Sequence, residues 1–143
     1  MTAPRVLFVC VKNGGKSQMA AGLLRRAARR ARLDVEVDSA GTRAGSALNA
    51  QSVQSLREVG VDISDQAPKQ LSEDMVRDAD LVVVLGSEAQ VEPVGGTPVE
   101  VWETDEPSLR GIEGAPRMAL VRDDIAARVD DLTRRLGTSS TPA

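Results

Sequence analysis

The run Leu81–Leu85, LVVVL, is the most apolar stretch of the chain and limits the fold more than any other segment. Because it has no polar residue at alternate positions, a strand built from it is covered on both faces. Strands of this kind are typical of parallel sheets that carry helices on both sides. A second apolar run, residues 6–9, also fits a buried strand. The two runs predict a parallel sheet with residues 81–85 near its centre.

Segments with helical and strand spacing alternate along the rest of the chain. Four segments place apolar residues at three- and four-residue steps, as amphipathic helices do: residues 17–33, 48–59, 71–79 and 118–136. Gly60 and Gly137 are expected to end the second and fourth helices. Residues 34–38 and 99–102 alternate like strands, and residues 39–42 are expected to form a turn at which a second active-site loop begins. The pattern predicts an α/β fold, a three-layer αβα arrangement with a four-stranded parallel sheet.

Length and charge bound the organisation of the protein. The 143 residues make one domain, expected to span residues 1–137, with residues 138–143 as a flexible polar tail. A net charge of −3 and a pI near 5.0 provide no overall field that would attract nucleic acid or an anionic membrane. No apolar stretch approaches the roughly 20 residues of a membrane span, and the N-terminus lacks a signal-peptide pattern. We therefore expect a cytoplasmic protein that acts on small molecules or proteins.

The only cysteine, Cys10, follows the first apolar run and opens the glycine-rich segment Val11-Lys12-Asn13-Gly14-Gly15-Lys16-Ser17. A strand, a loop and a helix N-terminus in this order direct unpaired backbone N–H groups and a positive helix end at one point. Such a point suits a tetrahedral anion and stabilises a thiolate on its rim. A lone cysteine after an apolar strand is otherwise usually a small buried hydrophobe, but the loop favours a functional thiol here.

Gly15-Lys16-Ser17 also matches the end of a nucleotide-binding loop of the form G-x-x-x-x-G-K-[ST]. The first glycine of that pattern would fall on Cys10, where a side chain replaces hydrogen at the tightest turn. The apolar run Leu81–Leu85 is also followed by glycine rather than by the aspartate that holds magnesium in such proteins. Both mismatches disfavour a nucleotide site.

Individual loop residues allow more than one role. Lys16 either neutralises a bound oxyanion or is an exposed residue of the first helical turn. Ser17 either donates to the Cys10 sulfur or caps the helix. Asn13 is expected to adopt left-handed backbone geometry and to tie the loop together through its side chain.

The chain has no histidine, so an acid or base must be a carboxylate or a lysine. The segment Glu103-Thr-Asp-Glu-Pro107 follows the last predicted strand, at the sheet edge expected for Cys10. Its carboxylates are either acid catalysts or part of a solvated loop.

The segment from Cys10 to Ala20 resembles the active-site loop of arsenate reductases built on the low-molecular-weight tyrosine phosphatase fold, in particular the arsenate-mycothiol transferases. The likeness extends to residues 39–42, 81–86, Trp102, Glu106-Pro107 and Arg122-Asp123. It implies that Cys10 attacks arsenate, that the N–H groups of residues 11–17 and the Lys16 ammonium bind its oxygens, and that Glu106 protonates the departing oxygen. Asp105 is a substitute for that acid.

Departures from the wider superfamily refine these expectations. Low-molecular-weight phosphatases carry arginine where Lys16 stands, and an ammonium lacks the fork that grips two oxygens, so weak phosphatase activity is expected. A chain without tyrosine also lacks the usual aromatic walls of a phosphotyrosine pocket.

The chain has no second cysteine, so a low-molecular-weight thiol must be the co-substrate: mycothiol by resemblance, or bacillithiol or glutathione. A glutaredoxin-like redoxin would then release arsenite, phosphate would compete with arsenate, and no bound cofactor or metal is expected. The alternatives are a phosphomonoester hydrolase and a non-catalytic oxyanion-binding module.

Overall fold

A central parallel sheet organises the protein, which a computed structural model describes over residues 3–139. Its strands are β1 (Arg5–Cys10), β2 (Glu36–Gly41), β3 (Leu81–Leu85) and β4 (Val99–Trp102), in the spatial order β2-β1-β3-β4. All three strand pairs are parallel. The predicted four-stranded parallel sheet is therefore confirmed, with β1 and β3 as the inner strands.

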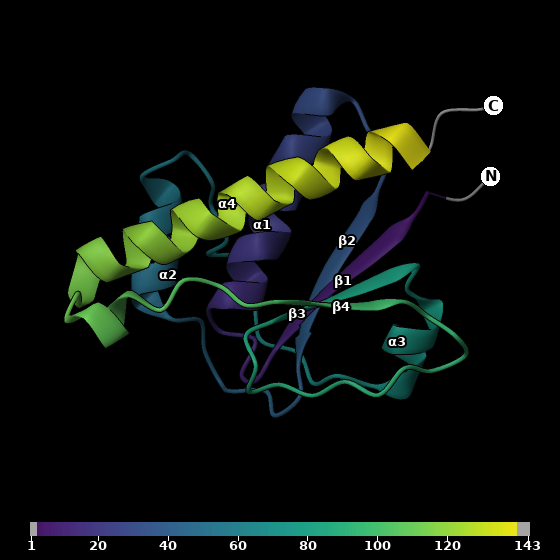
Figure 1. Ribbon diagram of the computed structural model, residues 1–143, viewed down its shortest axis with the longest axis horizontal. Helices are drawn as coiled ribbons and strands as arrows, with labels where there is room; N and C mark the ends of the chain where they lie inside the picture. Colours follow the sequence, from purple (N-terminus) through teal and green to yellow (C-terminus); the bar gives the residue numbers. More distant parts are fainter. Residues whose placement is uncertain (1–2, 140–143) are drawn as a thin grey trace.

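Helices cover both faces of this sheet, as Figure 1 shows. On one face α1 (Lys16–Ala31) and α2 (Ala50–Arg57) pack with the long helix α4 (Gly114–Ser139), while α3 (Glu73–Asp78) covers the other face. A short 3-10 helix, η1 (Pro107–Arg110), precedes α4. The three-layer αβα architecture is confirmed. None of the helices within residues 3–139 has the length and apolar character needed to cross a bilayer.

The first strand shows why a continuous apolar run is needed at the centre. Val6 and Phe8 pack into the core formed with α1, α2 and α4, whereas Leu7 and Val9 pack into the core on the α3 side. All four side chains are at most 3% exposed. Full burial of such side chains stabilises the fold by about 1.5–3 kcal/mol each. Both faces of β1 are thus occupied, and the chain that follows it is held in a fixed position.

The second strand extends further than the sequence predicted. It was expected over residues 34–38 with a turn at 39–42, but β2 runs from Glu36 to Gly41 and pairs Cys10 with Gly41. The small residues Ser39, Ala40 and Gly41 are buried and let the strand continue beneath the loop after Cys10. Their turn-like composition reflects this close approach rather than a chain reversal.

Helix boundaries also differ in detail. Gly137 does not end the last helix, which continues to Ser139; a Cβ at Gly137 would meet the Leu33 side chain at ordinary packing distance. The predicted tail loses residues 138–139 to this helix, and its remainder, residues 140–143, lies outside the described residues. The helices α2 and α3 begin later than predicted because Asn49 and Ser72 cap them.

Candidate active site

Cys10 is the last residue of β1, and Val11–Gly15 carry the chain to α1. Because β1 is an inner strand of a parallel sheet, this loop lies at the carboxyl edge, where ligands of such sheets bind. The thiol is partly exposed. The predicted sequence of strand, loop and helix N-terminus is confirmed, and Gly15 takes the N-cap position without a side-chain cap.

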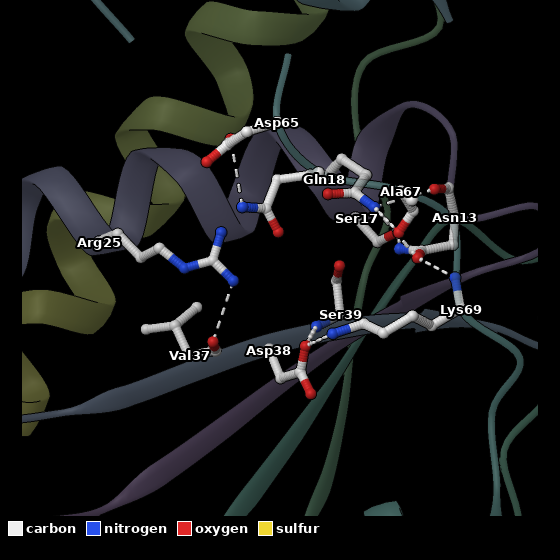
Figure 2. A network of polar contacts seen from close by, with 11 residues as sticks. Asn13, Ser17, Gln18, Arg25, Val37, Asp38, Ser39, Asp65, Ala67 and Lys69 are labelled. Atoms are coloured by element: carbon white, nitrogen blue, oxygen red, sulfur yellow. Dashed lines mark hydrogen bonds and ion pairs between the residues drawn. The ribbon is translucent and has the colours of Figure 1, made fainter. Parts of the chain in front are cut away.

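Asn13 is the buried centre of the loop, with a left-handed φ of 57° and no exposed surface. Its Oδ1 accepts the Lys69 backbone N–H at 2.9 Å and the Gln18 amide at 3.1 Å, which orients Nδ2 toward Ser17 at 2.7 Å (Figure 2). The Gln18 amide also contacts the Asn13 and Ala67 carbonyls. The predicted geometry of Asn13 is confirmed, and its side chain joins the loop to residues 67–69.

Ser17 contacts the cysteine rather than capping the helix. Its Oγ lies 2.9 Å from Cys10 Sγ and accepts the Asn13 Nδ2 hydrogen bond. Among residues 3–139 the sulfur is the partner left for the hydroxyl hydrogen, so we assign the O–H of Ser17 as the donor. The Asn13 backbone N–H also donates to the sulfur, at 3.3 Å. Two donors directed at one sulfur favour negative charge on it.

The carbonyl groups of the loop are fixed by the segment after β2. Four backbone bonds run from this segment to the loop: Thr42 to Cys10 at 3.1 Å, Arg43 to Val11 at 2.8 Å, Gly45 to Lys12 at 2.9 Å, and Asn49 to Gly14 at 2.7 Å. With the carbonyls occupied on this side, the amide hydrogens are directed elsewhere. Sequence reasoning placed a second active-site loop here but did not anticipate that it holds the first loop by backbone contacts.

The amide groups of the loop are left for a ligand. Within residues 3–139 the N–H groups of residues 14–17 donate to no protein acceptor, and those of Val11 and Lys12 do not either. Residues 16 and 17 belong to the first turn of α1, where the helix dipole is positive. An array of this kind binds a tetrahedral oxyanion.

The structure brings Glu106 to the loop across 90 positions of sequence. Its Oε1 accepts a hydrogen bond from Lys16 Nζ at 2.9 Å, and both side chains are partly exposed. Pro107 follows at the start of η1 and restricts the backbone beside this carboxylate. Lys16 and Glu106 line the same pocket, whereas Cys10 is not among the described residues that line it.

That pocket is a cavity of about 520 Å³. One part of its wall is the loop from Lys12 to Lys16, and Glu106 and Pro107 contribute another. The remaining residues come from α1, from the 45–52 region and from the start of α4. None of the lining residues is aromatic: Phe8 and Trp102 instead pack against each other in the core, with ring centroids 5.7 Å apart.

The sequence matches the family described as Low molecular weight phosphotyrosine protein phosphatase over residues 5–140. The chain belongs to this family. An arsenate reductase of Brevibacillus brevis is 37% identical over 129 residues, which cover 87% of this chain and 90% of that protein.

Solved structures within this phosphatase family agree with that assignment. A thioredoxin-dependent arsenate reductase of Corynebacterium glutamicum superposes with a TM-score of 0.77 at 31% identity; the match covers 98% of this chain but only 64% of that one. The chain thus spans less than two thirds of that protein. An arsenate reductase in the phosphate-binding state superposes with a TM-score of 0.76 at 26% identity, covering 93% of this chain and 98% of that one. The resemblance to arsenate reductases of this fold is confirmed.

Asp105, the other candidate acid, binds Arg110 rather than a residue of the cysteine loop. Its carboxylate is held by Arg110 through two hydrogen bonds, at 2.7 and 3.1 Å. The hydrogen bond from Arg110 lowers the pKa of Asp105. The group therefore stays ionised to more acidic pH than a free aspartate and is a poor proton donor near neutrality. Of the two neighbours, Glu106 is the one that reaches the phosphatase-type loop.

Gly41 is a positioning residue that the sequence indicated only as part of a turn. A Cβ at this position would lie 2.6 Å from the Val11 carbonyl oxygen, 2.9 Å from the Lys12 carbonyl carbon and 3.0 Å from the Asn13 nitrogen. These are backbone atoms of the loop that follows Cys10, so they yield only if the loop moves. Gly45 contacts the same loop, but there a Cβ would meet Lys12 atoms at 3.7 and 3.8 Å, which is ordinary packing.

We expect Gly41→Ala to lower catalytic efficiency about 10²-fold, because a displacement near 1 Å misaligns the anion site. Thermal unfolding should show a loss of about 1–3 kcal/mol from overpacking. Gly45→Ala is the matched control and should stay within about threefold of the parent. Equal activities for the two variants would contradict the role assigned to Gly41.

Proposed function

We propose that the protein is an arsenate reductase of the arsenate-thiol transferase type, with a low-molecular-weight thiol such as mycothiol as co-substrate. The observation that carries this proposal is the hydrogen-bonded Cys10 sulfur in a loop whose N–H groups are free for an oxyanion. The arsenate reductases among its relatives support arsenate as that oxyanion. Phosphate, which one structural neighbour binds, is the expected competitor.

Chemistry starts at the sulfur. The Cys10 thiolate attacks arsenic, an As–O bond breaks, and the departing oxygen leaves as water after protonation. The thiolate of the co-substrate then attacks arsenic and displaces Cys10, which gives an arsenic(V)–thiol adduct and the free enzyme. A thiolate of a redoxin attacks the sulfur of the adduct; the S–As electron pair stays on arsenic as arsenite, and a mixed disulfide forms.

The presence of a single cysteine supports an external thiol as the second sulfur. Reduction of arsenate to arsenite takes two electrons, which two thiolates supply when they form a disulfide. The 143 residues contain Cys10 and no second cysteine. The C. glutamicum neighbour is described as thioredoxin-dependent, but 36% of that chain has no counterpart here, so its electron source does not transfer directly.

Glu106 is the proposed acid of the first step. Its carboxylate accepts a hydrogen bond from the Lys16 ammonium. Arsenate oxygens compete for that ammonium, which would release the Glu106 carboxyl group to act on the departing oxygen. Lys16 then stabilises the oxyanion as a point charge.

An arsenate reduction assay with separate thiol systems tests the proposal. Mycothiol, bacillithiol and glutathione are each supplied with a matching redoxin, and thioredoxin is supplied with its reductase alone. We expect arsenite formation with at least one small thiol, at a rate at least tenfold above that with thioredoxin. Activity with thioredoxin alone would contradict the transferase assignment.

The same preparations distinguish the two alternative functions. A phosphomonoester hydrolase would hydrolyse an aryl phosphate without added thiol, and we expect that activity to be weak because Lys16 replaces a two-pronged arginine. An anion-binding module would bind phosphate and form no arsenite under any condition.

A further inference from the structure

Arg117 of α4 lies at the wall of the active-site pocket and has no hydrogen-bond or ion-pair partner among residues 3–139. Its Nε is buried and makes no hydrogen bond, and no ion pair among the described residues includes it. Neighbouring arginines are all satisfied by carboxylates: Arg110 by Asp105, Arg122 by Glu58 and Arg128 by Asp124. The Arg117 side chain as a whole is partly exposed at this wall, and no described residue accepts a hydrogen bond from it, so its accessible N–H groups suit an oxygen brought by a ligand.

The pocket is larger than the oxyanion requires. Its volume of about 520 Å³ lies in the range of roughly 300–1,000 Å³ that is typical of sites for whole organic ligands. A tetrahedral anion bound by the N–H groups of residues 14–17 fills only the end formed by the loop. The space beside Arg117, Met118 and Val121 remains available.

The residues that line the pocket carry more positive charge than the proposed oxyanion site needs. Lys12, Lys16 and Arg117 face the cavity with Glu106 as the single carboxylate, and Glu106 is already paired with Lys16. The surrounding chain is acidic, with a net charge of −3. A positive cavity in an acidic protein favours ligands that carry oxygen acceptors.

We propose that this cavity binds the thiol co-substrate and that Arg117 binds an oxygen acceptor on the body of that thiol, while its sulfur faces the loop. The inference rests on the proposed function, because it assigns a site to the second substrate of that reaction. Low-molecular-weight thiols are cysteine derivatives that offer such oxygens several bonds from the sulfur. Glutathione and bacillithiol offer carboxylates, which suit the guanidinium fork, whereas mycothiol offers neutral amide and hydroxyl oxygens.

Kinetics of Arg117→Met test the assignment. Methionine keeps an apolar chain of similar reach and removes the donors. We expect the KM for the thiol to rise at least about tenfold, as for a lost charged hydrogen bond, with the KM for arsenate and the inhibition by phosphate changed less than about twofold. Arg134→Met is the matched control, because Arg134 lies on the same helix but is not among the residues that line this pocket. A rise in the KM for arsenate instead, or an equal effect of both variants, would overturn the proposal.

A binding measurement separates this inference from the proposed function. S-methylglutathione and S-methylmycothiol, which cannot react, are titrated into the parent in the presence of phosphate, and methyl resonances of Met118 and Val121 are followed by NMR. We expect shifts that Arg117→Met abolishes and Arg134→Met retains. Shifts with these probes in a protein that forms no arsenite would support the thiol site while contradicting the reductase. Two results would overturn the thiol site but leave the reductase assignment intact. One is thiol-dependent arsenite formation with no shift of the methyl resonances. The other is the same activity with shifts that persist in Arg117→Met.

Arg117→Lys distinguishes the two kinds of acceptor and guards against misfolding. If a carboxylate is bound, lysine should recover part of the affinity for S-methylglutathione through its charge. If neutral oxygens are bound, lysine should recover little of the affinity for S-methylmycothiol. Thermal unfolding of both variants should match the parent, because Arg117 makes no protein hydrogen bond or ion pair among the described residues; a large loss of stability would overturn the assignment of Arg117 to a ligand.

Discussion

Cys10→Ser should abolish arsenate reduction, with a loss of at least about 10³-fold in kcat. Serine keeps the volume and can still contact Ser17, so the loop geometry is preserved. A hydroxyl is not ionised near neutrality, however, and cannot attack arsenic as a thiolate does. Arsenite production under saturating thiol and redoxin measures the effect.

Phosphate binding by the same variant provides the control. The N–H groups of residues 14–17 belong to the backbone and are unchanged, so affinity for phosphate should stay within about threefold of the parent. Ser17→Ala should show an intermediate loss of activity, because it removes a donor to the sulfur but not the nucleophile. If Cys10→Ser retained more than a tenth of the parent rate, Cys10 would not be the nucleophile.

Glu106→Gln is expected to lower kcat by about 10²-fold, within the range typical of a removed general acid. Glutamine is nearly isosteric and can still accept a hydrogen bond from Lys16, but it cannot donate a carboxyl proton. The initial rate of arsenite formation at saturating arsenate and thiol measures kcat for the parent and the variant.

Asp105→Asn is the matched control for this effect. The Asp105 carboxylate is bound by Arg110 and makes no hydrogen bond to the loop among residues 3–139, so its loss should change kcat by less than about threefold. The Lys16–Glu106 pair is partly exposed, and its removal should change stability by no more than about 1 kcal/mol. A larger loss for Asp105→Asn than for Glu106→Gln would reverse the assignment of the acid.

The cysteine loop could be predicted from sequence because its determinants are local. The apolar run before Cys10 requires a buried strand, Asn13 tolerates left-handed φ, and the helical spacing after Ser17 places a helix N-terminus next to the sulfur. The prediction of a turn at residues 39–42 was wrong because small residues are compatible with two different structures. The small residues 39–41 are suitable for a turn and equally for a strand beneath a loop, and only contacts with residues 11–13 select the strand.

Choice between Glu106 and Asp105 needed the tertiary structure. The two carboxylates are adjacent in sequence, and their partners, Lys16 and Arg110, differ only once the chain is folded. Arg117 gave no sequence signal at all, because its significance is the lack of a partner among residues 3–139 and its place in a pocket formed by three distant segments.

The sequence by itself determined the parallel αβα fold and the strand, loop and helix N-terminus that follow one another around Cys10. Periodic burial and backbone preference act over a few residues and can be seen in the order of amino acids. Tertiary structure alone decided which carboxylate meets the loop, why a side chain at Gly41 would meet that loop, and that Arg117, without a partner among residues 3–139, lines the cavity. These features depend on distances between segments that lie tens of residues apart, which only the packing of the folded chain fixes.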